Sequence, residues 1–206
     1  MNLRAALRNA WAQPLLLGFL FLPFVFLVLG IFQETLGPNP AEYLIRSTGE
    51  LTLRMLCVTL LITPLRVQLT LPELARFRRG LGLLTFFYAF MHALCYSLLD
   101  MELVWNDILN DIVKRPFILV GTLSFVLLSM LAATSFNRAV KAMGAKRWRK
   151  LHQVVYVIAG LAILHFFWMR SGKKNYEEVM VYGAILSLLL GWRIWHKWRA
   201  NLKSNP

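Results

Sequence analysis

The chain has 206 residues, 58% of them hydrophobic, and a formal net charge of +13. This hydrophobic share exceeds the roughly half of a typical soluble domain, and the apolar residues gather in blocks of roughly 17–22, long enough to cross a hydrocarbon core of about 30 Å. The composition therefore indicates a membrane protein. It argues against nucleic-acid binding, because the basic residues lie between apolar blocks and no polar domain would carry such a function.

Six apolar blocks predict an all-α fold, a polytopic membrane bundle of six transmembrane helices that forms one domain over residues 1–206. Helices are expected because a backbone in lipid must satisfy its own hydrogen bonds. The first block follows Arg4 and Arg8 but offers no small-residue cleavage site, so we interpret it as an uncleaved span. The predicted spans are 11–32, 51–65, 81–99, 117–133, 154–169 and 179–198.

The charges between these blocks predict an orientation with both termini in the cytoplasm. In that arrangement the inner segments carry a net charge of +15 and the outer loops one of −3, and Lys and Arg prefer the cytoplasmic side. The second block is short, with Arg54 near its start and Pro64 near its end. We retain it because its removal would place the most basic loop on the outer side.

The remaining motifs limit the chemistry. Cys57 and Cys95 both lie within apolar blocks, and the lack of a C-x-x-C-H motif excludes covalent haem attachment of the c type. No G-x-G-x-x-G fingerprint and no Walker loop occurs, so chemistry is expected within the membrane or on a partner. In the acidic loop Asp100–Pro116, apolar residues at helical spacing predict a short amphipathic helix on the outer surface.

Two histidines, His92 and His165, lie deep within the third and fifth blocks. An ionisable side chain at that depth is costly and indicates a functional site. Each lies 11 residues beyond the start of its predicted span, roughly 16 Å along its helix, so the two imidazoles are expected at one level, as axial ligands on opposite faces of a haem iron. Zinc fits less well, because a closed zinc site takes about four ligands and the spans offer no Asp or Glu.

Other polar residues suggest secondary roles. His152 lies 13 residues before His165, so it cannot share one small metal with it, but it could serve a second haem nearer the cytoplasm. Arg54, Arg78 and Arg79 are candidates for haem propionates, and the last two also for a flavin phosphate. Plain positive-inside placement explains these arginines equally well, and His196 is expected at the surface.

Several motifs resemble the haem-binding membrane subunits (MsrQ) of the bacterial periplasmic protein-methionine-sulfoxide reductase system, within the wider ferric-reductase-like transmembrane group. The most specific is K-R-W-x-x-L-H-x-x-V-Y at residues 146–156; R-R-G-L-G-L at 78–83 and the stretches 60–65 and 115–117 support it. The resemblance implies haem b ligated by His92, His152 and His165 in the bacterial inner membrane, with FMN as a further candidate cofactor. The number of haems stays open, because Arg79 stands where the wider group has a histidine.

The expected function is therefore electron transfer across the membrane by a subunit that is not itself catalytic. The resemblance implies a periplasmic molybdenum-containing partner that repairs oxidised methionine in proteins, with electrons from the quinone pool or a cytosolic flavin reductase. Two alternatives stay open: a stand-alone cytochrome b that reduces ferric iron or oxygen, and a transporter whose buried histidines bind a metal or small solute. Inverted repeats and broken helices would favour the transporter, and the sequence shows neither.

Overall fold

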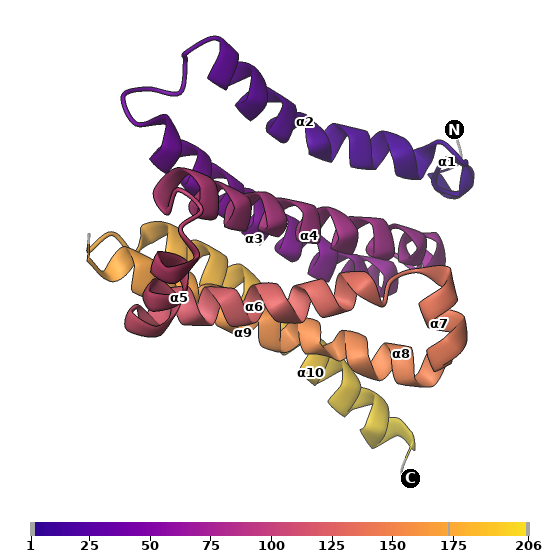
Figure 1. Cartoon of the computed structure of the whole chain (residues 1–206). Helices are drawn as coiled ribbons and strands as arrows, with labels where there is room; N and C mark the ends of the chain where they lie inside the picture. Colours follow the sequence, from indigo (N-terminus) through magenta and orange to yellow (C-terminus); the bar gives the residue numbers. More distant parts are fainter. Residues whose placement is uncertain (1–2, 173, 205–206) are drawn as a thin grey trace.

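A computed structural model describes residues 3–172 and 174–204, which form a bundle of helices without a strand (Figure 1). Successive long helices run in opposite directions, so that α1 and the last turns of α10 lie at the same end of the bundle. Lys173, one of the charges assigned above to the last outer loop, lies outside the described residues. The long helices are α2 (Ala12–Phe32), α3 (Pro40–Gln68), α4 (Phe77–Cys95), α6 (Pro116–Ala133), α9 (Val155–Ser171) and α10 (Glu177–Ser204).

Short helical segments connect the long ones. They are α1 (Leu3–Arg8), η1 (Pro72–Arg76), η2 (Tyr96–Asp100), α5 (Trp105–Lys114), α7 (Asn137–Met143), α8 (Ala145–Leu151) and η3 (His152–Val154). Five stretches of the described residues are long and apolar enough to cross a membrane, namely 12–32, 72–100, 116–133, 145–171 and 177–202. The predicted all-α polytopic fold is therefore confirmed.

The helix that contains the second predicted span begins well before that span. Helix α3 begins at Pro40 instead of residue 51, and it contains acidic residues that we had assigned to an outer loop. The Asn39 side chain caps this helix by accepting a hydrogen bond from the backbone N–H of Glu42 at 3.1 Å. The first half of α3 is too polar for a hydropathy pattern to reveal, yet α3 has its most extensive contacts with α4. Six membrane passes with cytoplasmic termini are compatible with this arrangement and stay a prediction.

Two other predicted segments differ less from the structure. Helix α4 begins at Phe77, four residues before the predicted start, and continues through the π-helical turn η2 to Asp100. The expected amphipathic helix in the acidic loop is α5, which turns Ile108 towards the bundle and leaves Leu109 exposed. Asp111 anchors this helix, because its carboxylate accepts a hydrogen bond from Tyr96 at 2.6 Å and pairs with Arg115 at 2.8 Å.

The main core lies where α3, α4, α6, α9 and α10 meet. Leu56 and Leu60 of α3 are 2% exposed there, and Ile158 and Ala159 of α9 are 2% and 1% exposed. Helix α2 lies at the edge of the bundle (Figure 1) and turns much of its surface outward. Large apolar residues on that surface suit contact with lipid; they include Leu15, Phe19 and Phe26.

The attachment of α2 to α4 depends on aromatic contacts and one hydrogen bond. Phe24 of α2 lies 4.9 Å from Phe87 of α4, measured between ring centroids. The fully buried Tyr88 donates from its hydroxyl to the carbonyl oxygen of Leu20 in α2 at 2.8 Å. Because the hydroxyl is buried away from water, losing this partner would be costly.

Replacing Tyr88 with Phe should therefore weaken the attachment of α2. We expect the free energy of unfolding to fall by about 1 kcal/mol, the usual net value of one hydrogen bond, measured by denaturant titration in detergent micelles. The matched control is Tyr43→Phe, at a residue that is 48% exposed. Equal stability of the Tyr88 variant and the wild type would show that this hydrogen bond does not hold α2.

Candidate functional site

The rings of His92 of α4 and His165 of α9 lie close together inside the bundle. Their ring centroids are 6.2 Å apart and their planes cross at 76°. Both side chains are partly buried. The structure thus brings together the two histidines that the sequence placed at a common depth.

Backbone carbonyls determine which ring nitrogen of each histidine is available. The Nδ1–H of His92 donates to the carbonyl oxygen of Ile45 in α3 at 2.8 Å, and the Nδ1–H of His165 donates to that of Phe117 in α6 at 2.7 Å. A carbonyl oxygen can only accept, so Nδ1 must carry the proton in both rings. In the neutral form, each Nε2 therefore keeps a lone pair for a metal.

The spacing of the rings suits one metal ion between them. Metal–imidazole bonds are about 2.0–2.1 Å long, so two opposed nitrogens lie roughly 4 Å apart and the centroids of their rings roughly 6.3 Å apart. The measured separation is 6.2 Å. Among the described residues, no three His, Cys, Asp or Glu side chains gather as a closed metal site. A haem iron takes two axial nitrogens from the protein while its macrocycle fills the other positions, and this requirement matches the two histidines.

The third predicted ligand, His152, lies in η3, directly before α9. Its ring stacks on Trp148, with 3.9 Å between the centroids, and its Nδ1–H donates to the carbonyl oxygen of Trp148 at 3.1 Å. Its Nε2 lies 3.4 Å from Oγ of Ser135, two residues after the end of α6. His152 is thus held at a separate level from the pair, with Nε2 turned towards the segment that follows α6.

A cavity of about 270 Å³ adjoins His152. Its polar and basic lining comes from α3, α4, α8, η3, α9 and α10, and includes Thr59, Thr63, Arg78, Arg79, Arg149, Gln153, Tyr156 and Arg193. Four guanidinium groups at one cavity give it a positive potential, which favours an anionic group.

Two of these arginines were predicted site residues, and each already has one hydrogen-bond partner. Arg78 donates to the hydroxyl of Thr63 at 3.2 Å, and Arg79 donates to the side-chain oxygen of Asn137 at 2.5 Å. Guanidinium groups have five N–H donors, so one such bond leaves donors for a ligand. The proposed contacts with propionates or a flavin phosphate stay a prediction.

Arg54, the remaining predicted site residue, belongs to a polar cluster between α3 and α10. It pairs with Glu50 at 2.5 Å and donates to the hydroxyl of Tyr182 at 3.0 Å; Tyr182 in turn donates to Glu50 at 3.1 Å. Glu50 thus lies inside a long helix of the bundle, one residue before the second predicted span begins at residue 51. Contact of Arg54 with a propionate stays a prediction.

Sequence reasoning also did not identify Arg193, which we had counted among the tail charges. It is partly buried in α10, where it donates to the carbonyl oxygens of Leu60 and Leu189 and lies over the ring of Tyr156. In the sequence, only the spacing of three residues between Arg193 and His196 could have indicated that they lie on one side of a helix, and this spacing does not predict burial. His196 is exposed, as expected, and stacks on Trp192.

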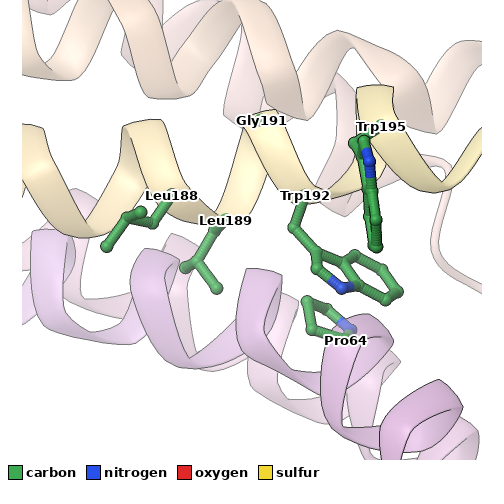
Figure 2. A pocket seen from close by; sticks show the side chains of 6 residues that line it. All are labelled: Pro64, Leu188, Leu189, Gly191, Trp192 and Trp195. Atoms are coloured by element: carbon green, nitrogen blue, oxygen red, sulfur yellow. The ribbon is translucent and has the colours of Figure 1, made fainter.

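An apolar groove of about 520 Å³ lies apart from these histidines, between α3 and α10 (Figure 2). Trp192 and Trp195 of α10 lie at one end of it, with Pro64 of α3 beside the ring of Trp192. Leu188, Leu189 and Gly191 complete its lining. The absence of charged residues in this lining distinguishes the groove from the cavity at His152.

Comparison with known proteins gives consistent matches. A family model described as the ferric reductase like transmembrane component matches residues 48–163. The chain is 58% identical over 187 residues to the protein-methionine-sulfoxide reductase heme-binding subunit MsrQ of Polaromonas naphthalenivorans, which covers 91% of this chain and 85% of that protein. The proteins of the same name from Herminiimonas arsenicoxydans and Ralstonia nicotianae are 47% and 44% identical, covering 89% and 96% of this chain and 84% and 88% of their own lengths. No solved structure matches.

The chain therefore belongs to the ferric-reductase-like transmembrane family, and among its members to the MsrQ group. It is a multi-pass membrane protein. The resemblance inferred from residues 78–83 and 146–156 is confirmed. The matched range begins at residue 48 and ends at residue 163, and thus contains His92 and His152 but stops two residues before His165.

The polar cluster of α3 and α10 generates a prediction about stability. Arg54→Gln removes the cation that pairs with the carboxylate of Glu50, and should lower the free energy of unfolding by up to about 1 kcal/mol, because the pair is partly exposed. Adding Glu50→Gln should restore part of this loss, because the paired residues are coupled. Denaturant titration in micelles measures all three variants. Arg46→Gln is the control, because it breaks a similarly spaced pair, with Glu42, nearer the end of α3. Additive effects of the two substitutions would contradict the coupling.

Proposed function

We propose that this chain is a transmembrane electron-transfer subunit that holds haem b between His92 and His165. The close approach of the two imidazoles, whose centroids are 6.2 Å apart and whose Nδ1–H groups each donate to a carbonyl, carries the proposal. The family gives independent support, since the relatives above are named as heme-binding subunits. A bound haem would supply one-electron redox chemistry.

The backbone carbonyls would hold the two histidine ligands in position before a haem binds. Because both Nδ1 protons are taken up by carbonyls, neither ring has to change its tautomer to offer Nε2. A donated Nδ1–H also makes the imidazole a more basic ligand. The bundle would keep water from the iron, and the helices would tune its potential through these contacts.

We further propose a second redox group at the cavity beside His152. Thirteen residues of helix separate His152 from His165, roughly 20 Å, and one haem alone would bridge too little of a core of about 30 Å. Arg78, Arg79 and Arg193 would neutralise an anionic group there, either the propionates of a second haem or the phosphate of FMN. Trp148 and Ser135 hold the His152 ring in place for the first of these.

The predicted orientation and the names of the relatives support a proposal for the donor and the acceptor. The basic end of the bundle would face the cytoplasm, where a flavin reductase or the membrane quinone pool would reduce the site beside His152. The acidic end would face the periplasm of a bacterial inner membrane. The relatives are named as subunits of a protein-methionine-sulfoxide reductase, so we propose a periplasmic molybdenum-containing reductase as the partner, which would repair oxidised methionine in proteins.

A reduced-minus-oxidised absorption spectrum of the purified protein tests the ligand assignment. We expect the bands of a low-spin haem b in the wild type, their complete loss in His92→Ala and His165→Ala, and at most a partial loss in His152→Ala. His196→Ala is the matched control, because that ring is exposed and should leave the spectrum unchanged. A colourless wild-type protein would refute the proposal and leave the transporter alternative ahead.

The role of the basic cavity is tested by the double variant Arg78→Gln and Arg79→Gln. Removing two charges should slow reduction by a quinol or a flavin reductase at least tenfold, because the anionic redox group loses its counter-charges. The dithionite-reduced spectrum of the His92–His165 haem should stay as in the wild type. Arg138→Gln, at an exposed position of α7, is the control. Unchanged reduction kinetics in the double variant would contradict a redox group in this cavity.

A further inference from the structure

Each of the paired histidines lies against a glycine of a neighbouring helix. A Cβ placed on Gly49 of α3 would lie 3.0 Å from both Cε1 and Nδ1 of His92. A Cβ placed on Gly121 of α6 would lie 2.8 Å from Nδ1 and 2.9 Å from Cε1 of His165. Any larger residue at these two positions would therefore meet an imidazole ring.

The same arrangement occurs twice. The carbonyl oxygen that accepts from His92 belongs to Ile45, four residues before Gly49, and the one that accepts from His165 belongs to Phe117, four residues before Gly121. In a regular helix, a carbonyl oxygen also accepts from the N–H four residues later, here that of the glycine itself. A carbonyl oxygen has two lone pairs, so it can accept both bonds. We call each pair, Ile45–Gly49 and Phe117–Gly121, a seat.

We propose that the two seats are positioning elements that set the rotation of both imidazole planes and hold them crossed. The hydrogen bond fixes where Nδ1 lies, and the glycine surface fixes the plane of the ring, so neither ring can turn without losing a contact. The observed crossing angle is 76°. The inference rests on the proposed function, because the rotation of the rings matters only if both bind one iron.

The rotation of axial ligands is visible in the electronic structure of ferric haem. Parallel imidazole planes split the two iron d orbitals that interact with the ring π systems, whereas crossed planes leave them nearly equal in energy. Near-equal orbitals give a low-spin EPR signal with an unusually large highest g value, and parallel rings give an ordinary rhombic signal. The seats therefore predict the large-g signal for the wild type.

Alanine at either seat should turn or shift the adjacent ring. For Gly49→Ala and Gly121→Ala we expect the highest g value to move towards the rhombic range. We also expect the midpoint potential to rise, because a weakened Nδ1–H bond makes the imidazole a less basic ligand for ferric iron. The controls are Gly160→Ala, in the same helix as His165, and Gly183→Ala in α10, because a Cβ at either position would have no neighbour within 4 Å.

The experiment measures EPR spectra and potentiometric titrations of the purified wild type and these four variants. Shifts in both seat variants with unchanged controls support the proposal, and so does loss of haem from seat variants whose helicity and elution match the controls. Unchanged g values and potentials in both seat variants overturn it, while the histidine variants still decide the ligand assignment. Should neither seat variant fold, the wild-type spectrum decides, because a rhombic signal would exclude crossed rings.

Discussion

The structure depends on one constraint, that a polar ring inside an apolar bundle needs a partner for its N–H. His92 and His165 both meet this need with a backbone carbonyl of an adjacent helix. These bonds link α3 to α4 and α6 to α9, and they place the proton of each ring on Nδ1, so that Nε2 keeps its lone pair. The same two hydrogen bonds therefore connect neighbouring helices and orient the two rings.

Charge divides the rest of the molecule into two unlike regions. In one region, Arg54 of α3 pairs with the carboxylate of Glu50 and donates to the hydroxyl of Tyr182. In the other, four guanidinium groups line one cavity beside His152. This difference favours an anionic group at the cavity, whereas the rings of His92 and His165 are oriented by hydrogen bonds to backbone carbonyls.

The sequence predicted the features that follow from long apolar blocks. Span 117–133 lies entirely within the observed α6. The depth of His92 and His165 predicted that their rings would meet, because the rise of a helix per residue is constant. The start of α3 could not be predicted from hydropathy, because the first half of this helix is charged and resembles a polar loop. Its charges form pairs four residues apart, which hydropathy does not detect. Gly49 and Gly121 gave no signal, since their role appears only when two distant helices are placed side by side.

His152 and His165 belong to a nearly continuous helical rod, in which η3 joins α8 to α9. The spacing of the two proposed redox sites is therefore set by a single rigid element and not by loops. An insertion or deletion of one residue between these histidines would shift one level by about 1.5 Å and turn one ring by about 100° around the helix axis. Members of this family can therefore vary their connecting loops in length, whereas this segment should keep a constant number of residues.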